Sequence, residues 1–322
     1  MTVAKKPKRA ALLLFGATVF WGASFILTKA LGDLQEARAP AVDSWLLSSL
    51  SLLIRFGGGA VVLALWNARR LGQLTGLEFR QGLGLGIFGG VGILLQMDGD
   101  MHTKASTCAF LTQCYCIFIP VFLVWRRRKW PAKTLALSCL MVLAGVAILS
   151  NVNWAEFRIG RGEWETIASS VFFTGQILWL ERSVFAPNDS QRMTVVMFAI
   201  MALVMMPTLL AHSANPRQWV ALYASPWAIG LILFLTLGCS VAAYSIMNEW
   251  QPHVPATEAG LIYCCEPMFT AIFALFLPGW LARWTGVDYP NEHLNHRLLL
   301  GGGLITGANF LMLLRKSAPE PV

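Results

Sequence analysis

The sequence contains few charged residues. Asp, Glu, Lys and Arg make up 13% of its 322 residues, and hydrophobic residues make up 56%, whereas a soluble domain is typically about 25% charged. This shortage of charge excludes an ordinary soluble domain. The long apolar runs that replace it indicate that lipid is the solvent of the fold.

Metal-binding motifs, disulfide frameworks and clustered histidines are also missing. The seven cysteines all fall in apolar runs, without the spacing of a zinc site or of a secreted disulfide framework. The five histidines lie in loops or at the ends of apolar runs. A membrane-embedded enzyme needs a clustered nucleophile and base or paired acids. We therefore expect no enzyme activity, no catalytic residue, no metal and no cofactor.

The apolar runs are long enough to cross a membrane. A spanning helix needs about 20 mostly apolar residues. The candidate runs are Ala10–Leu31, Ser44–Trp66, Gln81–Met97, Ser106–Trp125, Lys133–Ser150, Glu165–Phe185, Met193–Ala211, Trp227–Asn248, Ala256–Leu277 and Arg297–Leu314. They are continuous rather than alternating, which favours helices over a β-barrel. The expected fold class is an all-α integral membrane protein with ten transmembrane helices.

Basic residues are sorted by loop. If the N-terminus is cytoplasmic, most Lys and Arg fall in inner segments, including residues 5–9 and 126–129. An excess of Lys and Arg marks cytoplasmic loops. We therefore expect a multi-pass plasma membrane protein, for example in a bacterial inner membrane, with both termini cytoplasmic. The net charge of +8 then requires no nucleic acid, and the expected partners are the lipid bilayer and a small molecule.

The first apolar run is too long for a signal peptide. A signal core has about 7–15 apolar residues, whereas this run extends from Ala10 to Thr28. We expect it to be retained as a membrane helix.

The runs divide into two sets of five, and an odd number of spans inverts the second set. The expected domains are a cytoplasmic basic N-terminus (1–9), a first repeat (10–150), an outer loop (151–164), a second repeat (165–314) and a cytoplasmic tail (315–322). Aligning residues 106–111 with 257–262 places Tyr115 opposite Glu266. The arrangement predicts two inverted five-helix repeats around a central cavity.

Motifs along nearly the whole chain resemble the EamA family of the drug/metabolite transporter (DMT) superfamily. They are Trp21-Gly22-Ala23-Ser24-Phe25, Arg55-Phe56, Gln96, Ala109-Phe110-Leu111-Thr112, Pro120, Arg126–Lys129, Gln251, Pro255-Ala256-Thr257, Glu266-Pro267 and Gly302–Gly307. The resemblance implies ten helices in two inverted repeats that move small metabolites, often outward, through a central cavity. Asp98-Gly99-Asp100 and Pro278-Gly279 depart from the family pattern. Both departures lie toward the expected outer face, so they affect what the resemblance implies about extracellular gating and specificity rather than about the fold.

Two charged side chains are expected inside the membrane. A charge at a helix centre costs about 2.5–3.5 kcal/mol on insertion scales, so Glu266 and Arg55 should face the bundle interior. Glu266 either exchanges a proton or binds a substrate amine during transport, or it accepts backbone hydrogen bonds near Pro267. Arg55 either pairs with a substrate carboxylate or with Glu266, or it caps helix-end carbonyls. We hypothesise that the two residues belong to one polar network.

Pro120 and Pro267 are expected helix breaks, because each removes a backbone donor. Around these breaks the candidate substrate-binding residues are Trp21, Ser24, Gln96, Gln113, Tyr115, Gln176, Tyr244, Asn248, Tyr263 and Glu266. Small sites usually combine an apolar or aromatic lining with a few placed polar groups, so this set suits a small amphipathic solute such as an amino acid.

Together these patterns predict a secondary-active transporter that exports small metabolites by alternating access, with proton coupling at Glu266. The alternatives are a receptor or scaffold that does not transport, and a channel-like facilitator.

The glycine runs Gly82–Gly92 and Gly301–Gly307 are expected to let helices pack closely. The outer segment 279–296 lies either on the membrane surface or over the outer mouth.

Overall fold

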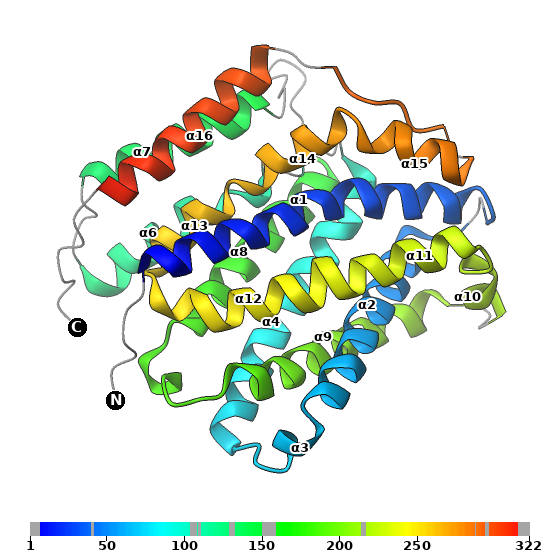
Figure 1. Ribbon diagram of the computed structural model, residues 1–322, viewed down its shortest axis with the longest axis horizontal. Coiled ribbons are helices and arrows are strands. Elements are labelled where there is room, and N and C mark those ends of the chain that lie inside the picture. Colours follow the sequence, from blue (N-terminus) through cyan, green and yellow to red (C-terminus); the bar gives the residue numbers. More distant parts are fainter. Residues whose placement is uncertain are drawn as a thin grey trace.

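The computed structural model is a bundle of helices (Figure 1). It describes residues 7–39, 42–103, 108, 111–128, 133–149, 159–213, 217–286, 288–293 and 296–314. The expectations for residues 1–6, 104–107, 151–158 and 315–322 therefore lie outside the described residues. All regular secondary structure in the described ranges is helical.

The longer helices are α1 (Pro7–Glu36), α2 (Ser44–Trp66), α4 (Gly76–His102), α6 (Tyr115–Arg127), α7 (Lys133–Leu149), α8 (Arg161–Leu180), α9 (Ser190–His212), α11 (Pro226–Phe234), α12 (Ala243–Trp250), α13 (Ala256–Tyr263), α14 (Glu266–Ala274), α15 (Leu277–Thr285) and α16 (His296–Leu314). Short helices are α3 (Ala68–Leu71) and α10 (Arg217–Leu222), and a π-helical stretch, Leu235–Ala242, joins α11 to α12. Each of the expected apolar runs overlaps one of these helices or a consecutive pair.

Five described helical segments are long and apolar enough to cross a membrane. They are Lys8–Glu36, Ser44–Trp66, Gly76–His102, Ser190–His212 and Pro226–His253. A bent pair, Ala256–Ala274 with Leu277–Thr285, would make a sixth, and shorter apolar helices cover Tyr115–Arg126, Lys133–Ile148 and Leu299–Ala308. The protein is therefore a multi-pass helical membrane protein.

The exterior of the bundle is apolar. Leu12, Leu65, Leu140, Leu203 and Leu299 are each more than 60% exposed. A soluble monomer rarely exposes so much contiguous apolar surface. In a bilayer these side chains meet lipid, which explains why no second protein layer covers them.

Helix α4 occupies the middle of the bundle and packs along both α8 and α9. Its glycines allow this close approach: a Cβ at Gly82 would lie 2.7 Å from the Met193 carbonyl oxygen, and a Cβ at Gly86 only 2.5 Å from Ile200 Cβ. Small residues at such positions let membrane helices pack at short range. The expectation for the run Gly82–Gly92 is confirmed.

The two broken helices have turns at matching positions. One turn, at Gln113 and Cys114, precedes α6, and the other, at Cys264 and Cys265, precedes α14. Tyr115 and Glu266 are therefore the first residues of the helices that follow the turns.

The assignment of Pro120 as a helix break is wrong, because it lies inside α6. A proline inside a helix deprives the carbonyl four residues earlier of its donor. Here that carbonyl belongs to Cys116, and the Cys139 thiol donates to it at 3.4 Å. The replacement donor lets the helix continue. Pro267 lies in the first turn of α14, where a missing N–H is tolerated.

The expected loop after Leu277 begins with a helix. Helix α15 follows α14 at an angle of 57° and bears Trp280 and Trp284, both more than half exposed. The Trp284 ring lies 5.5 Å from that of Trp227, a grouping typical of the membrane interface. Farther along, Tyr289 packs against a buried cluster to which α1, α11, α14 and α15 contribute. The segment thus has an interfacial part and a part that packs on the bundle.

The glycine packing yields a stability prediction. Replacing Gly86 by Ala should destabilise the fold by about 1–3 kcal/mol, the usual range for overpacking, because Ile200 and the Met197 carbonyl oxygen leave no room for a methyl group. Gly32→Ala is the matched control, since nothing lies within 4 Å of its added Cβ. Thermal unfolding in detergent would measure both, and equal melting temperatures would contradict the packing role.

Candidate functional site

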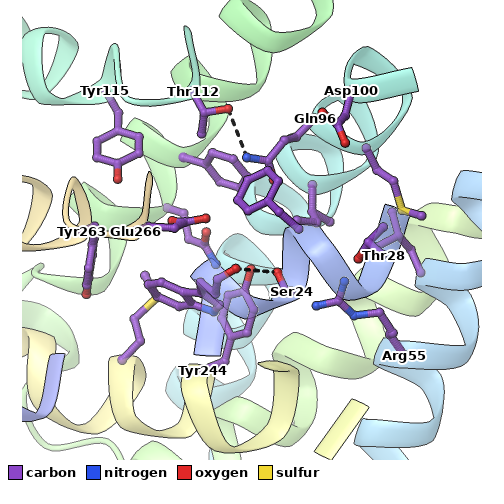
Figure 2. A pocket seen from close by; sticks show the side chains of 18 of the residues that line it. Ser24, Thr28, Arg55, Gln96, Asp100, Thr112, Tyr115, Tyr244, Tyr263 and Glu266 are labelled. Atoms are coloured by element: carbon purple, nitrogen blue, oxygen red, sulfur yellow. Dashed lines mark hydrogen bonds between the residues drawn. The ribbon is translucent and has the colours of Figure 1, made fainter. Parts of the chain in front are cut away.

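A cavity lies between helices from both halves of the chain (Figure 2). Its polar lining comes from Ser24, Thr28, Arg55, Gln96, Asp100, Thr112, Gln176 and Glu266, and its aromatic lining from Trp21, Phe25, Tyr115, Phe173, Tyr244 and Tyr263. The cavity volume is about 100 Å³, which holds several waters at roughly 10–15 Å³ each. The bundle therefore contains a cavity that combines polar and aromatic groups and is large enough to be hydrated.

Most of the candidate residues gather around this cavity. Trp21, Ser24, Gln96, Tyr115, Gln176, Tyr244, Tyr263 and Glu266 line it, as does Arg55. Gln113 and Asn248 do not. Gln113 accepts a hydrogen bond from the Tyr115 hydroxyl at 2.6 Å, and Asn248 donates to the Thr194 hydroxyl at 2.9 Å. The Gln113 amide thus stabilises the turn before α6, and the Asn248 amide joins α12 to α9.

Glu266 enters the cavity from the start of α14. Figure 2 shows its carboxylate pointing toward the cavity centre, and it forms no side-chain hydrogen bond or ion pair with a residue that the structure describes. The free N–H groups at a helix start favour a negative charge. The turn at Cys264 and Cys265 therefore presents an acidic group that protein partners leave available to a ligand or a proton.

Arg55 enters from α2 and is only 5% exposed. Its Nε donates to the Ser240 hydroxyl at 3.1 Å, in the π-helical stretch between α11 and α12. No ion pair joins Arg55 to Glu266 within the described part of the chain, and Figure 2 shows the two on opposite sides of the cavity. Arg55 and Glu266 therefore share a cavity without contacting each other directly.

The remaining guanidinium nitrogens of Arg55 point toward the cavity in Figure 2 and have no hydrogen-bond partner among the described residues. Because Arg stays charged and its planar fork matches a carboxylate, this end of the cavity suits an anionic group.

Aromatic rings form one wall. Trp21 makes edge-to-face contacts with Tyr244 at 5.5 Å and with Tyr263 at 5.3 Å between ring centroids. Tyr244 in turn packs against Phe56 and Phe198. The buried Trp21 Nε1 has no hydrogen-bond partner among the described residues. Since buried polar groups are normally satisfied, this N–H is available to water or to a solute.

Two glutamines make similar contacts beside the two turns. Gln96, on α4, donates to the Thr112 hydroxyl at 3.1 Å, just before the first turn. Gln251, after α12, accepts from the Tyr263 hydroxyl at 2.9 Å, just before the second turn. Each glutamine thus ties a preceding helix to a helix break at the cavity.

Several lining residues were missed by sequence reasoning, above all Thr28 and Asp100. Each lies four residues after a candidate that was selected, Thr28 after Ser24 and Asp100 after Gln96. Residues four apart share a helix face, so extending the candidates by one turn would have found both. Thr112 lies beside the turn and needed the tertiary structure.

A charged cluster joins α4 to α8 outside this cavity. The ligating atoms of Asp98, His102 and Glu165 lie within 4.8 Å of one another, a grouping absent from the sequence analysis because it joins distant segments. Arg161 already binds Asp98 at 2.5 Å and Glu165 at 2.8 Å. Its guanidinium supplies the positive charge that these carboxylates need, so we assign the cluster to helix pairing.

The structure is thus an apolar helical bundle whose interior contains a cavity with charged and aromatic lining residues. The family model described as "EamA-like transporter family" matches residues 8–151. Over that segment, which is less than half of the chain, the sequence is similar to the EamA-like transporters.

Other known proteins resemble the chain. An uncharacterized transporter of Archaeoglobus fulgidus is 24% identical over 82% of this chain and 88% of its own length. An uncharacterized transporter of Haemophilus influenzae is 29% identical over 43% of this chain and 81% of its own. A crystal structure of 18% sequence identity superimposes with a TM-score of 0.64 and covers 95% of this chain and 97% of that one. The last likeness concerns the fold alone.

The contact between Tyr263 and Gln251 generates a prediction. Tyr263→Phe should destabilise the protein by about 1–3 kcal/mol, because it leaves the buried Gln251 amide oxygen without its donor. Tyr289→Phe serves as the control, since the Tyr289 hydroxyl bonds to no described residue. Thermal unfolding in detergent would compare the two, and a Tyr263→Phe protein as stable as the control would refute the assignment.

Proposed function

We propose that this protein is a secondary-active transporter that exports small amphipathic solutes by alternating access. The observation that carries the proposal is the cavity itself, which both halves of the chain line and which contains Glu266 and Arg55. A site between two hydrophobic halves with broken helices is the arrangement found in many secondary carriers. The outward direction rests on the family resemblance.

We also propose that the halves are inverted repeats, 10–150 and 165–314. The two matching turns support this, as do the two glutamine contacts beside them. The contacts between helices also fit a two-fold relation between the halves. Under that relation α4 corresponds to α12 and α8 to α1, and the structure contains both of the matching contacts, α4 with α8 and α12 with α1. The relation also pairs α2 with α9 and α7 with α16, and the members of each pair contact each other.

The repeats imply ten spans and cytoplasmic termini. In Figure 1 the start of α1 and the end of α16 lie toward the same side of the bundle. The sorting of basic residues supports the cytoplasm as that side. The substrate would contact the lining residues named above, while Gln113 and Asn248 would hold their helices in place.

Transport is testable by counterflow. Purified protein in liposomes preloaded with amino acids, nucleosides or organic cations should accumulate the labelled form of its substrate transiently and saturably. A channel-like facilitator would show neither saturation nor counterflow. A receptor or scaffold would bind without moving solute. Either result would overturn the proposal.

Glu266 provides the test of proton coupling. We expect Glu266→Gln to slow transport at least tenfold and to abolish its dependence on pH, because the amide cannot exchange a proton. Glu249→Gln, at an exposed position on α12, is the matched control. Transport by Glu266→Gln at the wild-type rate and with the wild-type pH profile would exclude Glu266 as the coupling group.

A further inference from the structure

Besides Glu266, the cavity lining contains a second carboxylate, that of Asp100. Asp100 lines the cavity from α4, one turn after Gln96. Its Oδ1 is buried and has no hydrogen-bond partner among the described residues. A nearby donor is the thiol of Cys108, a weak one. An unpaired buried carboxylate oxygen is costly unless something else satisfies it.

No described residue neutralises Asp100 by direct contact. Lys29 acts on it electrostatically, but Lys29 is exposed, its ammonium lies 6.0 Å from the Tyr289 ring centroid, and no ion pair joins it to Asp100 in the described ranges. Likewise, none joins Asp100 to Arg55. Asp100 therefore remains available to a positive group in the cavity.

Asp100 and Arg55 lie toward one side of the cavity in Figure 2, beside Thr28, and Glu266 lies on the other side. A carboxylate and a guanidinium on the same side of a cavity, each with polar atoms that no described residue binds, complement the ammonium and the carboxylate of one solute. When Asp100 and Arg55 hold these two groups, Glu266 on the other side of the cavity still has no positive partner. The aromatic residues Trp21 and Tyr244 line the same cavity.

We propose that Asp100 and Arg55 bind the ammonium and carboxylate of an α-amino acid, while Glu266 binds a second basic group on its side chain. The preferred solute is thus a cationic amino acid, with two positive groups and one negative group that complement the cavity. This inference rests on the proposed function, whose substrate class it specifies. It also gives Asp100 a role in specificity.

The experiment compares L-lysine with L-norleucine, which has a similar side chain without the terminal amine. Equilibrium binding to the purified full-length protein in detergent should favour lysine at least tenfold, as expected for one added charge-assisted contact. Asp100→Asn should weaken binding of both ligands at least tenfold and leave their ratio within about threefold. Glu266→Gln should instead reduce the preference for lysine at least tenfold.

Matched variants control for folding and for general charge effects. Asp100→Glu keeps the carboxylate and should retain binding of both ligands. Glu36→Gln removes an exposed carboxylate on the same helix as Thr28, away from the cavity lining, and should change neither affinity. Thermal unfolding and size-exclusion chromatography of each variant would identify any that misfolds, in which case Asp100→Glu and Glu266→Gln carry the test.

The outcomes separate this inference from the proposed function. Saturable counterflow of other solutes without binding of lysine would overturn the inference and leave the transporter intact. Lysine binding with the expected variant pattern, but without counterflow, would keep the inference and overturn transport. Asp100→Asn protein that binds both amino acids as tightly as wild type would remove Asp100 from the site.

Discussion

The low polarity of the bundle interior governs this structure, because every polar group there must find its partner within the protein. Backbone carbonyls inside the helices accept from nearby hydroxyls, as in Ser24 to Trp21, Ser49 to Trp45 and Thr166 to Gly162. The carbonyl freed by Pro120 accepts from a thiol of another helix. Some buried side-chain atoms have no partner among the described residues, and three of them, on Trp21, Asp100 and Gln176, belong to residues that line the cavity, where solvent or a solute can complete the bonding.

Helix α4 is held by contacts along its length, and it positions two polar side chains in the cavity. At its start, Glu78 accepts two hydrogen bonds from Arg192 of α9, and near its end Asp98 pairs with Arg161 of α8. Between these ends, glycines bring α4 against both neighbours. The same helix turns Gln96 and Asp100 into the cavity. Close packing thereby fixes the positions of two polar side chains that would be expensive to leave mobile in an apolar medium.

The two halves meet at the cavity with different chemistry. After matching turns, α6 begins with Tyr115 and α14 begins with Glu266. The phenol is satisfied by Gln113, whereas the carboxylate has no such partner in the described part of the chain. Similar backbone geometry therefore supports a structural contact in the first half and an available charge in the second. Corresponding positions of the two halves therefore present different groups to the cavity.

The sequence by itself determined the membrane class, the helical runs and the family resemblance, because apolar length and the scarcity of charge are properties of composition and order. It also identified Glu266 and Arg55 as interior groups, since lipid excludes them. Only the tertiary structure decided that α6 continues through Pro120, because the replacement donor, Cys139, lies on another helix. It also decided that Arg55 contacts Ser240 rather than Glu266, and that Asp100 shares their cavity. These outcomes depend on which helix faces meet, and periodicity along one chain does not specify that.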